Sequence, residues 1–257
     1  MRTFTFKGLF LTVLFVLLGS LAIQAADDGL ITEQITIKLD EAGTLPDKIS
    51  ANEKNLITNL KIVGKINGTD LKFIREMAGR VNEEKTDGKL SILDLSEAKI
   101  VAGGDAYVRF SDNYYTSNDK LGDWAFYGCS GLTSLTIPSG VTSIGNFAFL
   151  GCSGLTSIYV YLEKLPKLGT YIFSGCDANN CKVYVPTGTY DDYLVSEFGY
   201  FENIVEFDAT GIDKVTTSTD AKELSRYSVN GQRLSAPAKG LNIVKYSDGS
   251  VKKVVVQ

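Results

Sequence analysis

The chain contains the phrase AF-x-GCSGLTS twice, beginning at Ala125 and again at Ala148. A looser third copy follows, and the cysteines of the three units lie 23 and then 24 residues apart. Other residues keep the same offsets, namely Phe126, Phe149 and Phe173 and also Gly128, Gly151 and Gly175. A fixed period of this length is typical of a solenoid, in which each unit adds one layer and contacts its neighbours.

A second pattern, L-x-x-L-x-L, extends the repeats towards the N-terminus. It occurs as Ile57-Leu60-Ile62, Leu90-Leu93-Leu95, Leu132-Leu135-Ile137 and Leu155-Ile158-Val160, with a degenerate copy at Val183 and Val185. Alternation in short segments predicts strands with one buried face, and repeats of this kind are leucine-rich repeats. The expected fold is therefore mainly β: a leucine-rich-repeat solenoid of short parallel strands with one convex-side helix, an N-terminal cap strand and a small C-terminal all-β module.

Two units are longer than the others. Apolar residues recur at helical spacing in TDLKFIREMAGR, which predicts a helix capped by Thr69 or Asp70 and stopped by Gly79. The stretch 101–123 is rich in Gly, Asp, Asn and Tyr, which predicts a loop emerging from the solenoid. The later, shorter units leave room for a second short strand such as Val141–Gly145 and a tight turn before each Phe.

The ends of the chain have different compositions. Residues 1–25 combine a basic start, an apolar run from Leu9 to Ile23 and small residues, which predicts a secretory signal peptide. We expect an N-terminal cap over 26–55, the repeat domain over 56–207 and a polar linker over 208–222. In 223–257, hairpin turns at Asn230-Gly231 and Ser247–Gly249 separate alternating segments, which predicts a small β module. No other long apolar run predicts a membrane-spanning segment.

The chain contains no histidine, which removes the commonest general base and metal ligand. We therefore predict no catalytic residues, no cofactor and no metal, and we read Asp191, Asp192 and Glu197 as solvated residues on a segment that closes the solenoid. Net charge is −4 without a basic stripe, which argues against a nucleic-acid partner.

The cysteines have two readings. A metal or redox site is one reading, but single cysteines one repeat apart favour a buried ladder of free thiols. Cys181 follows Cys176 by five residues, so these two form a candidate disulfide.

Candidate binding residues are the tyrosines of the inserted loop and of the outward strand positions. The loop supplies Tyr107, Tyr114 and Tyr115, and its last residue, Trp124, aligns with Phe147 and Tyr171 and is expected in the core. The outward positions should form a row across the sheet through Lys61, Asp94, Thr136, Tyr159 and Tyr184. Large rigid aromatic side chains dominate binding hot spots, although an ordinary solvated face explains such a row equally.

The units AFYGCSGLTSLTIPSGVTSIGNFAF resemble the BspA-like leucine-rich repeats of Bacteroidetes surface proteins. Segments such as NGTDLKFIREMAGR and KVYVPTGTYDDYLVSEFGYFENIVEF resemble those that accompany the repeats, so the resemblance covers about 31–207. It implies a secreted or outer-surface protein that mediates protein–protein interaction or adheres to host or extracellular-matrix proteins. The alternative is a glycan-binding or carbohydrate-active surface protein.

The C-terminal YSVNGQRLSAPAKGLNIVKYSDGSVKKVVV resembles the sorting modules of type IX secretion. Its matching parts are Gly240–Val244 and Lys252–Val256, whereas Asn242 stands where the usual module has an aromatic residue. The resemblance implies delivery to the cell surface.

Overall fold

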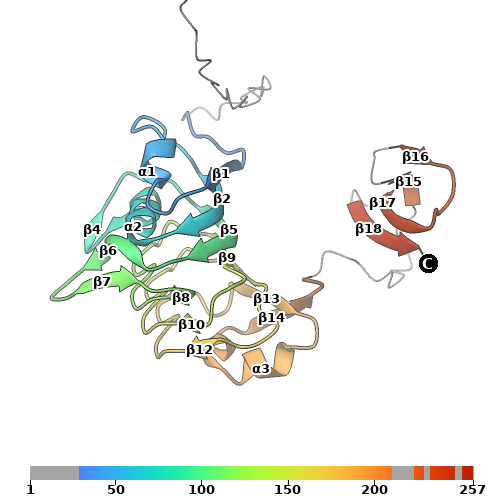
Figure 1. The fold of residues 1–257 in the computed structure, drawn as a ribbon. Helices are drawn as coiled ribbons and strands as arrows, with labels where there is room; N and C mark the ends of the chain where they lie inside the picture. The colour runs from blue at the N-terminus through green and yellow to red at the C-terminus, as the bar shows by residue number, and fades with distance from the viewer. Residues whose placement is uncertain (1–28, 210–222, 229–231, 247–250, 257) are drawn as a thin grey trace, which may run out of the picture.

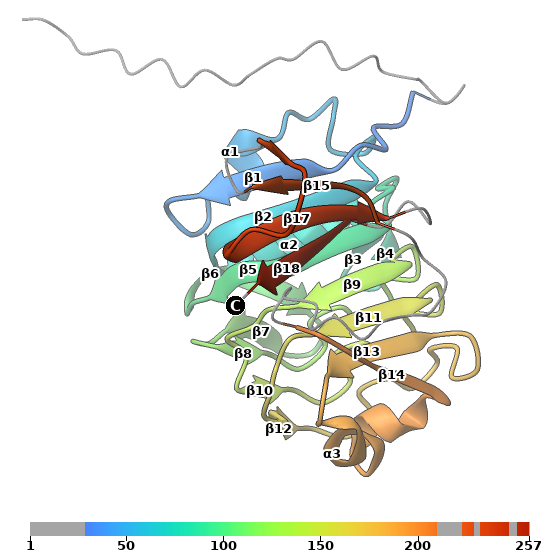
Figure 2. The ribbon, with the colours of Figure 1, turned by 90° about the vertical axis from the view of Figure 1, so that its right-hand side faces the viewer.

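A computed structural model describes residues 29–209, 223–228, 232–246 and 251–256. Its main feature is a parallel sheet of seven strands, each one layer of a solenoid (Figures 1 and 2). In spatial order these are β1 (Ile35–Leu39), β2 (Asn59–Ile66), β5 (Ile92–Ile100), β9 (Ser134–Ile137), β11 (Ser157–Val160), β13 (Lys182–Pro186) and β14 (Asn203–Phe207). Every neighbouring pair is parallel. The predicted solenoid of short parallel strands is confirmed.

The opposite side of the shorter units holds a second, three-stranded parallel sheet. Its strands are β8 (Lys120–Leu121), β10 (Ser143–Ile144) and β12 (Lys167–Leu168). β10 lies inside the segment 141–145 in which the repeat spacing predicted a second strand. In the core, the rings of Phe126, Phe149 and Phe173 stack at centroid distances of 5.7 and 5.5 Å, and their planes are within 5° of parallel. The repeated Phe therefore forms the spine of the core.

A ladder of hydroxyl groups joins the long N-terminal units to the short ones. Each side-chain hydroxyl donates a hydrogen bond to the backbone carbonyl one layer earlier, over 3.0–3.1 Å. The donors are the hydroxyl groups of Thr58, Ser91, Thr133 and Thr156, and the acceptors are the backbone carbonyls of Ile31, Thr58, Ser91 and Thr133 respectively. Because the ladder crosses both irregular units, the long and short repeats form one continuous stack.

The predicted helix is α2 (Gly68–Met77), but its cap differs from the prediction. The N-cap is Asn67, whose side chain accepts from the backbone of Thr69, and Asp70 is the N3 partner of the same capping box. Gly79, with φ +86°, follows the helix and ends it as predicted. Asp70 also binds the preceding segment and the short helix α1 (Leu45–Lys48), because its buried carboxylate accepts from the backbone of Gly43 and Leu45.

The inserted stretch is a hairpin, so its prediction as a loop was wrong. β6 (Gly103–Arg109) and β7 (Asn113–Thr116) pair antiparallel and project from the repeat domain (Figure 1). β6 packs against α2 so closely that a Cβ on Gly68 would lie 1.9 Å from the carbonyl oxygen of Asp105. A smaller hairpin, β3 (Arg80–Val81) with β4 (Glu84–Lys85), follows α2.

The C-terminal end of the solenoid is closed by α3 (Tyr190–Leu194) and the 3-10 helix η1 (Glu197–Tyr200). Tyr193 of α3 and Phe198 of η1 are buried, whereas Asp191 and Asp192 of α3 are exposed. Among the described residues no helix is long and apolar enough to cross a membrane.

The C-terminal residues form a separate four-stranded antiparallel sheet. Its order is β16 (Arg233–Leu234), β15 (Glu223–Ser228), β17 (Gly240–Tyr246) and β18 (Val251–Val256). The predicted all-β module is confirmed, while both predicted hairpin turns, the signal peptide and residues 210–222 of the linker lie outside the described residues. Asn242 is buried and forms hydrogen bonds with the side chain of Arg226 and the backbone of Ala238. This polar side chain therefore stabilises the interior of the sheet.

Candidate protein-binding surface

The outward row predicted from the strand pattern exists. Backbone pairing places its members opposite one another on consecutive strands, in the order Thr36, Lys61, Asp94, Thr136, Tyr159, Tyr184 and Val205. In each strand the neighbouring residues point into the core, as the buried Leu135, Ile158 and Val183 show. The row therefore crosses the whole outward face of the seven-stranded sheet.

The C-terminal half of this face is aromatic. We call Tyr159, Tyr161, Tyr184 and Phe207 the sheet-face aromatic patch. Tyr159 and Tyr184 stack with ring centroids 4.5 Å apart and planes 5° from parallel. Phe207 stands edge-on to the three tyrosine rings at 5.1–6.5 Å. These contacts fix the rings of all four residues before any partner binds.

The hydroxyl group of Tyr159 remains protonated at neutral pH. Burial raises the pKa of Tyr159 above its ordinary value, and the adjacent Tyr184 and Tyr161 raise it further. The patch combines apolar ring edges with hydroxyl groups that can donate or accept hydrogen bonds.

The N-terminal half of the face is charged but internally paired. The ammonium group of Lys61 lies 3.4 Å from Asp94 and 2.7 Å from Glu97. The hydrogen bond to Glu97 is the main reason that the pKa of Lys61 is raised. Since these charges satisfy one another, the aromatic half has more capacity for a new contact.

The three tyrosines that were predicted as binding residues in the inserted stretch lie in different environments. Tyr107 is 3% exposed and its hydroxyl donates to the carbonyl of Asp123 over 2.7 Å, so its prediction as a binding residue was wrong. Tyr114 is half-buried and packs edge-on against Phe110. Tyr115 is 55% exposed on the hairpin. The physical reason is that β6 covers α2, which puts one face of the hairpin in the core.

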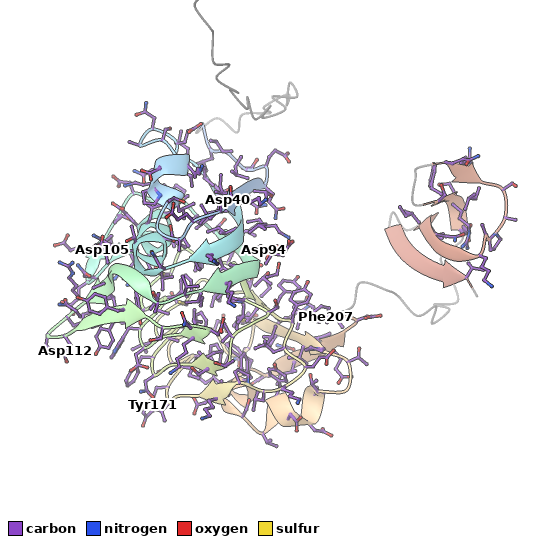
Figure 3. All side chains as sticks on the ribbon, viewed as in Figure 1. Asp40, Asp94, Asp105, Asp112, Tyr171 and Phe207 are labelled. Carbon is purple, nitrogen blue, oxygen red and sulfur yellow. The ribbon has the colours of Figure 1, made fainter. Side chains whose placement is uncertain are left out.

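Trp124 aligns with Phe147 and Tyr171 as predicted, and it packs half-buried against the core, but the series as a whole is not buried. The rings stack in order at 4.3 and 5.8 Å; Trp124 and Phe147 are half-buried, and Tyr171 is 65% exposed. All three residues have φ between 53° and 60°, so each occupies a left-handed turn. In Figure 3, Tyr171 lies on the opposite side of the repeat domain from Asp94 and Phe207.

All four cysteines are buried free thiols. The thiol of Cys152 donates to the carbonyl of Phe126 over 3.1 Å, and Cys176 repeats this contact with Phe149 at 3.4 Å. The candidate disulfide between Cys176 and Cys181 is absent, because the Cys176 thiol is directed at the previous layer of the stack. Burial raises the pKa of both Cys176 and Cys181 to about 12, which leaves them unreactive at neutral pH.

The buried Arg75, which was not predicted as a structural residue, binds the backbone of the first layer in the stack of short units. In that stack, Phe126 N donates to the carbonyl of Ala148, and each later layer repeats such bonds. The first layer has no preceding layer of this type, and the guanidinium of Arg75 donates instead to the carbonyls of Trp124, Ala125 and Tyr127 at 2.9–3.3 Å. Arg75 lies four residues after Leu71, so helical periodicity could have placed it on the buried stripe.

The described residues contain no cluster of three or more His, Cys, Asp or Glu side chains that could hold a metal ion. The surface described above presents rigid rings, hydroxyl groups and paired charges.

Comparison with known families agrees with the repeat pattern. Residues 119–219 match the family model described as BspA type Leucine rich repeat region, in 6 copies. The matched segment includes β9, β11, β13 and β14, and the unmatched β1, β2 and β5 continue the same sheet. A search of curated proteins found no match. This segment is thus similar to BspA-type leucine-rich repeats, and such repeats suggest a role in protein–protein interaction.

Proposed function

We propose that this is an exported, cell-surface leucine-rich-repeat protein that binds another protein without catalysis. The observation that carries the proposal is the sheet-face aromatic patch, a rigid aromatic surface on the outward face of the solenoid sheet. Solenoids commonly use such extended faces for binding. Aromatic anchors that need little ordering lose little conformational entropy on binding.

The arrangement of the rings favours a protein partner over a glycan. Sugars stack on open aromatic faces, but Tyr159 and Tyr184 cover each other's faces and Phe207 meets both edge-on. The patch therefore presents ring edges and hydroxyl groups, which suit apolar side chains and backbone carbonyls of a polypeptide. Tyr171 has an open ring, but it lies on the other side of the domain (Figure 3).

Export and surface location are part of the proposal. The signal-like residues 1–25 and the resemblance of 223–257 to a sorting module support them. The resemblance to BspA-like proteins suggests host or extracellular-matrix proteins as partners. Asn242, at the position where the sorting modules have an aromatic residue, is buried and donates to the carbonyl of Ala238, which is compatible with the resemblance of 223–257 to such a module.

The proposal is tested by binding to a panel of immobilised extracellular-matrix proteins and, in parallel, to a glycan array. The chain and its Tyr159→Ser/Tyr184→Ser variant are compared, with Tyr115→Ser as the matched exposed-tyrosine control. We expect binding to a protein that the double variant loses and the control retains. Binding confined to glycans, or protein binding that the double variant retains, would refute the proposal.

A further inference from the structure

The C-terminal end of the repeat domain exposes an apolar surface. Tyr190 and Leu194 are four residues apart on α3, so they lie on one face of that helix, and Val195 follows directly. These side chains are 40%, 44% and 85% exposed. Exposed apolar groups gathered at one end of a solenoid mark an interaction site or a surface that another part must cover.

This apolar surface lies in a strongly acidic segment. Residues 187–207 contain five acidic side chains and no lysine or arginine. Asp191 and Asp192 lie on α3 itself, directly between Tyr190 and Leu194 in sequence, and both are exposed. In the part of the chain that the structure describes, neither forms a salt bridge. We call Tyr190–Val195 the acidic end surface.

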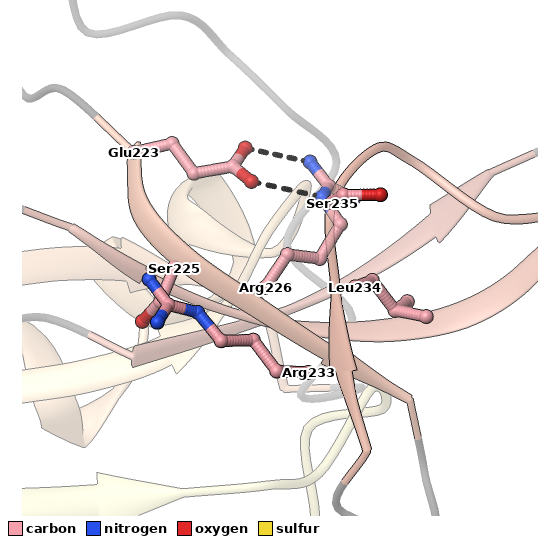
Figure 4. Close-up of a pocket in the computed structure, with 6 residues that line it drawn as sticks. All are labelled: Glu223, Ser225, Arg226, Arg233, Leu234 and Ser235. Carbon is pink, nitrogen blue, oxygen red and sulfur yellow. Dashed lines mark hydrogen bonds and ion pairs between the residues drawn. The ribbon is translucent and has the colours of Figure 1, made fainter.

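The C-terminal sheet has the opposite charge. Residues 223–257 contain six lysine and arginine residues against two acids. The sheet also holds a cavity of about 520 Å³, shown in Figure 4, which is lined by Glu223, Ser225, Arg226, Arg233, Leu234 and Ser235. We call this the basic pocket.

The two arginines of the basic pocket have different roles. Arg226 is buried and donates hydrogen bonds to both carboxylate oxygens of Glu223 and to Asn242, so it is a fixed part of the pocket wall. Arg233 is exposed, extends on the Ser225 side of the pocket in Figure 4, and has no ion pair among the described residues. It is therefore a cation available for a carboxylate, beside serine hydroxyl groups and the half-buried Leu234.

From these complementary surfaces we propose that the basic pocket of one copy docks on the acidic end surface of a second copy. Arg233 would contact Asp191 or Asp192, and Leu234 would pack against the apolar side chains of α3. The contact joins two different surfaces, so it is heterologous and each dimer keeps one free acidic end and one free pocket. Chains of copies, rather than a closed pair, are the expected assembly.

Sedimentation velocity of the chain without its predicted signal peptide tests the proposal over a range of protein concentrations. We expect self-association that grows with concentration in about 0.05 M salt and weakens in about 1 M salt, where charges are screened beyond about 3 Å. Asp191→Lys/Asp192→Lys and Arg233→Glu should each weaken it by about tenfold or more, as opposed charges become like charges. Asp112→Lys, a charge reversal on the distant hairpin, is the matched control and should leave association unchanged.

Mixing the two variants distinguishes a second copy from other occupants. The first variant keeps an intact basic pocket and the second keeps an intact acidic end surface, so an equimolar mixture should recover a heterodimer. Recovery also proves that both variants fold. Failure to recover, absence of self-association in the unmodified chain, or association that neither variant weakens would overturn the proposal.

Discussion

The buried carboxylate of Asp70 provides the sharpest stability prediction. It is fully buried and accepts three backbone N–H groups: one oxygen binds Gly43 at 2.6 Å and Asn67 at 2.9 Å, and the other binds Leu45 at 2.9 Å. These bonds join α2 to the segment that covers the first layers. Asp70→Asn preserves the shape but leaves one acceptor oxygen, so the N–H of Leu45 faces an amide N–H.

The expected loss in the free energy of unfolding can be estimated from the hydrogen bonds that Asp70→Asn changes. A buried unsatisfied donor costs about 1–3 kcal/mol, and converting two charge-assisted bonds to neutral ones costs about 1 kcal/mol each. Burying a neutral amide is easier than burying a carboxylate, which offsets part of this loss. We therefore expect Asp70→Asn to lower the free energy of unfolding by about 3 kcal/mol.

Urea unfolding followed by tryptophan fluorescence measures this change, because Trp124 is the single tryptophan of the chain and lies in the repeat domain. Trp124 is also joined to α2 through the hydrogen bond from Arg75. Asp112→Asn, on the exposed hairpin tip, is the matched control and should change stability by less than about 0.5 kcal/mol. An equally small effect of Asp70→Asn would refute the role given to this carboxylate.

Three further outcomes are expected. A thiol reagent at neutral pH should label none of the four buried cysteines in the native chain and all four after unfolding; labelling of only two would reveal a disulfide between Cys176 and Cys181. Tyr107→Phe should cost about 1 kcal/mol in urea unfolding, as one buried hydrogen bond is lost, without weakening partner binding; a binding loss would contradict its core position. Arg226 lowers the pKa of Glu223, so this pair stabilises the C-terminal sheet above the ordinary glutamate pKa and the contribution disappears as pH falls through the lowered value. Acid unfolding of the sheet, followed by circular dichroism, should therefore shift to higher pH in Glu223→Gln, and an unchanged transition would count against the pair.

Much of the repeat domain could be predicted because its repeats put identical residue types in identical layers. The spacing of the leucines and cysteines predicts which residues occupy equivalent positions in successive layers. The alternation within each strand predicts which residues form the outward row. Tyr159 and Tyr184 were predicted as neighbours for this reason, and their rings stack. Phe207 was missed as part of the patch because β14 lacks the leucine pattern that marks the other strands.

The remaining errors arose where tertiary contacts override local signals. Glycines and turn-forming residues around 101–123 predicted a loop, yet packing of β6 on α2 stabilises a hairpin and buries Tyr107. Trp124 was expected in the core and packs half-buried against it, but the alignment did not reveal that Tyr171, at the end of the same series, is exposed. Helical periodicity could have placed Arg75 on the buried side of α2, but its partners could not be predicted, since they are backbone carbonyls some 50 residues away in sequence.

The central claim is that the sheet-face aromatic patch binds a protein partner. The most direct measurement is the Kd for a partner found in the matrix-protein panel, compared between Tyr159→Ser/Tyr184→Ser and the hairpin variant Tyr114→Ser/Tyr115→Ser. Hot-spot residues contribute about 2 kcal/mol or more, so the sheet-face variant should raise Kd by about 30-fold or more while the hairpin variant stays within about threefold. A loss of affinity confined to the hairpin variant would contradict the account and move the binding surface to the opposite side of the domain.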